Sequence, residues 1–286
     1  MGYGAWSASS WDNYKSKRSI SDTSTVKEIY TSRSLKDQYN PRKIKMRESC
    51  DSEEHPNSTP IILGLDVTGS MGYLSEEIAK NALNTLILNI YNNAIVNDPQ
   101  VMVMAIGDCF SDSSPLQVTQ FESDIRVAEQ MTSLYFEGAG GGNGGESYLA
   151  AWYFASRHTS IDSYTKHGKK GFLITIGDEP THKILTKEQI KEFFGDDVED
   201  DLTAEDLFKE VSEKYNVFHI CVGSYGYHGS DKKWKALIGE RAYVLNDHRK
   251  LPEMIAGILK VASQEEDFVD YNENLESNND EGLVEL

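Results

Sequence analysis

The sequence predicts an α/β fold with a doubly wound, mainly parallel central sheet and helices on both of its faces. Short, nearly continuous apolar runs recur along the chain, as in strands that are buried on both sides of a parallel sheet. Stretches with apolar residues three to four positions apart lie between these runs, as in amphipathic helices. The 286 residues are enough to bury a large core. Strands that alternate with helices favour this fold over an all-helical or all-strand one.

The first 57 residues differ from the rest in composition. They are rich in Ser, Tyr, Lys and Arg and show almost no aliphatic periodicity. Up to Glu48 they carry ten basic and five acidic residues. We expect an extended basic arm with no core of its own, in which Tyr3, Trp6, Trp11 and Tyr14 are aromatic anchors that can bury on a surface.

The central part, residues 58–264, is expected to form one domain. Thr203 followed by Asp206 resembles a capping box and predicts a helix start. The apolar runs predict four strands and a weaker fifth, at Pro60–Leu65, Val101–Ile106, Gly171–Ile176, Val217–Val222 and Ala242–Leu245. The periodic stretches predict helices at Ser75–Val96, Glu146–Arg157, Leu202–Tyr215 and Leu251–Ala262.

The charge distribution limits the possible partners. Residues 265–286 hold nine acids and neither Lys nor Arg, which is typical of a solvated tail, with a partner-binding acidic tail as the alternative. The formal net charge of −18 disfavours binding to nucleic acid. No apolar run is long enough for a membrane span, and the polar start lacks a signal region, so we expect a cytoplasmic protein without membrane contact.

A polar motif follows the first predicted strand directly, where ligands of such sheets bind. In D-V-T-G-S-M-G, Asp66, Thr68 and Ser70 present a carboxylate and two hydroxyls at alternate positions. Hard oxygens of this kind suit Mg²⁺, Mn²⁺ or Ca²⁺. The alternative is that Asp66 and Ser70 only cap the following helix.

Two further segments are expected at the same edge of the sheet. Asp178 ends the Gly171–Ile176 strand region in I-T-I-G-D-E-P-T-H. The loop G-A-G-G-G-N-G-G-E precedes a predicted helix and offers Asn143 as an oxygen ligand. A phosphate-binding loop is the rival interpretation, but the loop has no lysine and no G-x-x-x-x-G-K-S/T pattern.

With these residues the chain resembles the von Willebrand factor A (VWA) domain superfamily over about residues 59–263, and its intracellular members more than its adhesion domains. The resemblance assigns Asp66, Thr68 and Ser70 to the first loop of a variant metal-ion-dependent adhesion site and Asp178 to its third loop. In the second loop G-G-N stands in place of the usual G-G-T, so Asn143 takes the position of the Thr ligand.

Other residues near these loops are candidates for supporting the metal. Asp108, Glu146 and Glu179 are possible outer partners of the ligands, and His182 can line the mouth of the site. The alternative for Glu146 is a carboxylate at the positive end of a helix dipole. His219 lies in an apolar strand pattern and is expected to be a core histidine.

The resemblance implies a non-catalytic adaptor that captures an Asp or Glu of a protein partner through an open position on a bound Mg²⁺, or Mn²⁺ or Ca²⁺. It also implies an AAA+ ATPase as a possible partner. One alternative is a structural component that self-assembles through the basic arm as a clasp. Another is a metal-assisted hydrolase or phosphotransferase that uses the same acidic edge.

Overall fold

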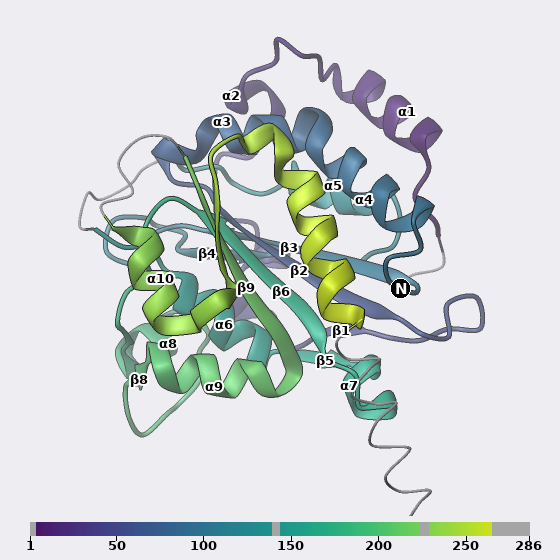
Figure 1. Cartoon of the computed structure of the whole chain (residues 1–286). Helices are drawn as coiled ribbons and strands as arrows, with labels where there is room; N and C mark the ends of the chain where they lie inside the picture. Colours follow the sequence, from purple (N-terminus) through teal and green to yellow (C-terminus); the bar gives the residue numbers. More distant parts are fainter. Residues whose placement is uncertain (1–3, 139–143, 224–228, 265–286) are drawn as a thin grey trace, which may run out of the picture.

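A computed structural model of the chain describes residues 4–138, 144–223 and 229–264 (Figure 1). Its central sheet has six strands in the order β10-β9-β6-β2-β3-β4, and every neighbouring pair is parallel except β3 and β4. This topology confirms the predicted fold class. The strands are β2 (Thr59–Asp66), β3 (Pro99–Ile106), β4 (Leu116–Val118), β6 (Gly171–Gly177), β9 (Tyr215–Val222) and β10 (Ala242–Leu245).

Helices cover both faces of this sheet (Figure 1). On one face lie α3 (Gly72–Glu77), a π-helical turn (Ile78–Ala82), α4 (Leu83–Asn92), α5 (Arg126–Met131) and the helix over residues 251–264. On the other face lie α6 (Tyr148–Arg157), α8 (Lys187–Phe193), α9 (Ala204–Lys214) and α10 (Ser230–Ile238). The short α7 (Asp162–His167) follows β5 (Thr159–Ile161), and β7 (Ile184–Leu185) pairs with β8 (Leu202–Thr203).

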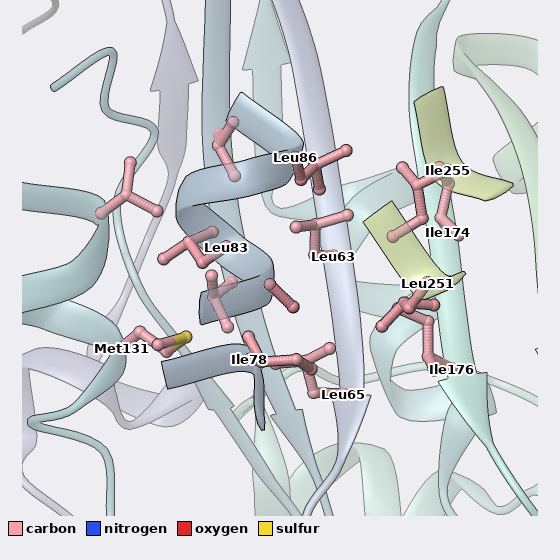
Figure 2. Close-up of a cluster of buried hydrophobic side chains, with 14 of the residues drawn as sticks. Leu63, Leu65, Ile78, Leu83, Leu86, Met131, Ile174, Ile176, Leu251 and Ile255 are labelled. Carbon is pink, nitrogen blue, oxygen red and sulfur yellow. The ribbon is translucent and has the colours of Figure 1, made fainter. Parts of the chain in front are cut away.

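Alternation along the strands divides the core into two layers. In β2, Leu63 and Leu65 belong to the layer that contains α4, whereas Ile62 belongs to the layer that contains α6. Figure 2 shows the first layer, in which side chains from α4 and from the 251–264 helix lie over the sheet. Its labelled members are Leu63, Leu65, Ile78, Leu83, Leu86, Met131, Ile174, Ile176, Leu251 and Ile255.

The helix after the first strand departs from the expected Ser75–Val96. It starts earlier, at Gly72, widens into the π-helical turn and ends at Asn92. Beyond it Ala94 adopts a left-handed conformation with φ of 45°, which ends the helical path. The capping box of α9 is present as predicted, because Thr203 and Asp206 each bond the other's backbone N–H.

The N-terminal arm is partly helical and contributes to the core, where its composition predicted an extended appendage. It contains α1 (Ala8–Arg18), α2 (Val26–Ile29) and β1 (Arg47–Ser49), which pairs with β5. Trp6, Trp11 and Tyr14 are buried in the same layer as α4, and the Trp6 indole N–H donates to Asn84 Oδ1 at 2.9 Å. The arm is therefore anchored in the core by buried aromatic side chains and not by periodic aliphatic ones.

Among the helices that the structure describes, none combines the length and the apolar character of a membrane-crossing segment.

Candidate metal site

The polar loop after β2 is held in shape by Asp66. Its carboxylate oxygen Oδ1 accepts the Thr68 backbone N–H at 2.9 Å and the Thr68 hydroxyl at 2.6 Å. Asp66 and Thr68 are buried, whereas Ser70 is exposed. No side chain of the loop caps the 3₁₀ turn Gly69–Met71 or α3 that follow. Helix capping therefore does not account for these three polar residues.

Asp178 closes the cluster from the neighbouring strand. It follows β6, which pairs with β2, so both carboxylates lie at the carboxyl edge of the sheet. Ser70 Oγ donates to Asp178 Oδ1 at 3.2 Å and lies 3.4 Å from Thr68 Oγ1. The structure thus brings Asp66, Thr68, Ser70 and Asp178 together, while the expected ligand Asn143 lies outside the described residues.

Tyr148 contributes to the site although its sequence position gave no sign of it. It begins α6, is fully buried, and its hydroxyl donates to Asp66 Oδ2 at 3.0 Å. The contact requires a glycine at position 177, because a Cβ there would overlap the Tyr148 hydroxyl and lie 2.9 Å from Asp66 Cβ. Asp66 therefore has donors on both of its oxygens.

Glu146 was predicted as an outer partner of the ligands or as the first residue of a helix, and it does not start the helix. The helix α6 starts two residues later, and the Glu146 backbone instead pairs with the next loop. Its N–H donates to Pro180 O at 3.0 Å and its carbonyl accepts the His182 N–H at 3.3 Å. The side chain is 5% exposed, and its Oε2 has no hydrogen-bond partner among the described residues.

Negative charge accumulates in this buried region. Burial raises the pKa of Glu146, and the carboxylates of Asp66, Asp108 and Asp178 raise it further. Burial also raises the pKa of Asp66, with a smaller contribution from Asp178 and an opposing one from the Thr68 hydrogen bonds. A divalent cation would offset this repulsion, so the donor set and the unpartnered Glu146 oxygen fit a hard metal ion.

The loop that carries Asp178 is braced by α10. Ser230 Oγ donates to the Asp178 carbonyl at 3.0 Å, and Trp234 Nε1 donates to the Glu179 carbonyl at 3.1 Å. Trp234 stacks on His219 with ring centroids 3.7 Å apart. His219 is fully buried and its Nδ1 pairs with Thr175 Oγ1 at 2.8 Å, which fits a core histidine. Glu179 thus contacts α10 through its backbone.

Asp108 is fully buried and bonds to residues other than the four clustered above. Its Oδ1 accepts from His182 Nε2 at 2.8 Å, and its Oδ2 accepts from Ser111 Oγ at 2.9 Å. His182 in turn lines an open groove of about 640 Å³ that extends to α9 and α10. The groove is also lined by Gly144, Pro180, Thr181, Lys183, Ile184, Thr203, Ala204, Glu205, Lys233, Trp234, Ala236 and Leu237.

Comparisons with known proteins give structural matches only. No protein-family model and no curated protein matches the chain. The SpaC pilus adhesin of Lactobacillus rhamnosus GG is similar at 10% identity and a TM-score of 0.48, over 76% of this chain and 31% of that chain. Proximal thread matrix protein 1 of the mussel byssus, with a zinc-occupied MIDAS motif, is similar at 10% identity and a TM-score of 0.43, over 74% and 48%.

A third similar structure is a von Willebrand factor type A protein from Catenulispora acidiphila. It matches at 14% identity and a TM-score of 0.37, over 71% of this chain and 42% of that chain. This chain spans less than half the length of each of the three proteins.

Proposed function

We propose that the chain is a non-catalytic protein-binding module of the VWA type that depends on a divalent cation. The observation that carries this proposal is the contact between Ser70 and Asp178. It joins the loop after β2 to the end of β6, so that two carboxylates and two hydroxyls from adjacent strands face one another. Oxygen donors without nitrogen or sulfur are the set that Mg²⁺, Mn²⁺ and Ca²⁺ prefer.

In this proposal Asp66, Thr68, Ser70 and Asp178 hold the cation, and Glu146 supplies a further carboxylate oxygen. Asn143 remains a predicted ligand on the basis of the sequence. When bound, the cation supplies a position at which an Asp or Glu of a protein partner is captured. The chain's own residues fix the loop, through the two Thr68 hydrogen bonds and the Tyr148 hydroxyl, before any partner arrives.

The charge of the surface beside Asp178 is consistent with binding of an acidic partner segment. The groove that starts at Pro180 is lined by Lys183 and Lys233, which are both exposed. Glu205 also lines the groove, so the formal charge of the groove is +1. On a chain with a net charge of −18, a groove of net positive charge favours an anionic segment over a neutral one. A partner carboxylate at the cation and further acids along the groove would use both features.

The first test measures Mn²⁺ binding to the full chain by titration calorimetry. The variants D178N and S70A should weaken Mn²⁺ binding by about tenfold or more, because D178N removes the negative charge of one proposed ligand and S70A removes the oxygen of another. The matched control D200N changes an exposed acid of the 195–201 loop and should bind Mn²⁺ like the wild type. Equal affinity in all four proteins would overturn the proposed site.

The second test addresses partner and catalysis. A displayed peptide library is panned on the wild type in Mn²⁺ and eluted with EDTA, and each recovered peptide is remade with Asn or Gln in place of its acids. Loss of binding on removal of one carboxylate supports carboxylate capture, whereas unchanged binding refutes it. Turnover of phosphoesters or nucleotides that disappears in D178N and persists in D200N would overturn the non-catalytic assignment.

A further inference from the structure

A second group of metal-binding side chains lies next to the first site. Asp108 and Cys109 follow β3, and His182 lies in the loop after β6. One carboxylate oxygen, the thiol sulfur and one ring nitrogen of these residues lie within 4.8 Å of one another. Two loops that are more than 70 residues apart in sequence thus converge on one point, with the β2 loop between them in the sheet order.

The neighbouring residues hold these three side chains in place. Asp108 is fully buried, and its Oδ1 also accepts the Phe110 backbone N–H at 3.2 Å. Gln189 Nε2 donates to Cys109 Sγ at 3.1 Å, and the Cys109 N–H donates to Ser147 Oγ at 2.7 Å. A donor set that is positioned before the metal arrives loses little conformational entropy on binding.

The His182 ring is fixed but accessible. Its side chain is 16% exposed, and the Phe110 ring packs edge-on against it with centroids 4.9 Å apart. Because His182 also lines the groove beside α9 and α10, an ion has a path from solvent to the cluster. Asp108 Oδ1 lies 2.8 Å from His182 Nε2 and Gln189 Nε2 lies 3.1 Å from Cys109 Sγ, so both donor atoms already face polar partners that an ion can replace.

We propose that Asp108, Cys109 and His182 form a site for Zn²⁺ or a similar transition-metal ion. Sulfur, imidazole nitrogen and carboxylate oxygen are the three ligand types of protein zinc sites, and they differ from the all-oxygen set of the first site. Tetrahedral zinc places its ligand atoms roughly 3.3 to 3.8 Å apart, so small side-chain rotations bring the cluster to binding distance. Cys109 binds as the thiolate and releases its proton to solvent.

The test uses Co²⁺ as the probe ion in place of Zn²⁺, because a cobalt–thiolate bond gives a near-ultraviolet charge-transfer band that oxygen ligands do not give. The wild-type chain should develop this band on addition of one equivalent of Co²⁺, and Zn²⁺ should displace it. C109S should lose the band, and H182Q should weaken Co²⁺ binding by about 100-fold. The matched controls C50S and H55Q, which change residues outside the cluster, should keep the wild-type band and affinity.

This inference does not depend on the proposed function, and the variants distinguish the two sites. S70A should leave the cobalt–thiolate band unchanged, whereas C109S should leave Mn²⁺ binding at the first site intact. Absence of the band in the wild type, or its persistence in C109S, overturns the proposal. Urea unfolding of C109S without metal, with a midpoint near that of the wild type, shows that a lost band reflects the missing sulfur and not an unfolded chain.

Discussion

Replacing Gly177 by alanine tests whether the close packing of β6, β2 and α6 at this residue holds Asp66 and Tyr148 in place. Gly177 is the last residue of β6 and faces both Asp66 from β2 and Tyr148 from α6. A Cβ at this position would overlap the Tyr148 hydroxyl oxygen and lie 2.9 Å from both Cβ and Oδ2 of Asp66. Real Cβ atoms do not tolerate such contacts, so one of the partners must move.

The structure indicates the size of the effect. The Tyr148 ring is fully buried and packs edge-on against His219 and Trp234, so it has no open space to enter. Overfilling a packed core costs about 1 to 3 kcal/mol. Displacing the hydroxyl also removes the donor from Asp66 Oδ2, and a hydrogen bond to a charged group contributes about 1.5 to 3 kcal/mol. We expect the free energy of unfolding to fall by about 3 to 5 kcal/mol.

The assay is urea unfolding of metal-free protein, with G257A as the matched control. Gly257 lies on the helix over residues 251–264, and a Cβ there meets no atom within 4 Å. An exposed helical Gly→Ala change should raise the free energy of unfolding by about 0.5 to 1 kcal/mol. The same substitution should therefore have opposite signs at the two positions. A G177A protein within about 0.5 kcal/mol of the wild type would refute the reasoning.

Three further changes probe the arm, a helix cap and a buried histidine by chemical unfolding. W6A should lower the free energy of unfolding by about 3 kcal/mol, because Trp6 is buried in the main core; an effect below about 1 kcal/mol would mean that the arm is dispensable. T203A should cost about 1 kcal/mol through the lost cap of α9, whereas T23A on an exposed residue should cost almost nothing. Burial holds the pKa of His219 well below its usual 6.5, so only the unfolded chain gains this proton as the pH falls. Below about pH 6.5 the free energy of unfolding of the wild type should therefore fall more steeply with decreasing pH than that of H219L. The difference in slope should reach up to about 1.4 kcal/mol per pH unit, and equal slopes would contradict the reasoning.

The sheet was predictable because its central strands are buried on both faces. All residues of β3 and β6, and nearly all of β2, are buried, which requires continuous apolar runs that stand out in sequence. The edge strand β4 has three residues, one of them Gln117, and carries no such signal. The packing of the arm was harder to predict, since it depends on a few aromatic side chains that reach a core formed by another part of the chain.

The convergence of Asp66, Thr68, Ser70 and Asp178 followed from one physical rule. Carboxyl ends of neighbouring parallel strands meet at one edge of the sheet, so polar residues placed directly after them lie close together. The position of Glu146 did not follow from this rule. Its side chain is buried because its backbone pairs with Pro180 and His182, a long-range contact that local periodicity does not encode.

Glu146 connects the two proposed metal sites electrostatically. Its carboxylate lies close enough to both Asp66 and Asp108 for each to raise its pKa, so it interacts with one acid from each donor set. A cation bound at either set would neutralise part of the charge that attracts a cation to the other. Coupling free energies are reciprocal, so Mn²⁺ at the oxygen site and Zn²⁺ at Asp108, Cys109 and His182 should weaken each other by the same factor. E146Q alters a proposed ligand of the oxygen site, so it should weaken Mn²⁺ binding there. It also removes the carboxylate that interacts with both donor sets, so it should bring this factor closer to one, and it keeps the sulfur and imidazole ligands of the other site.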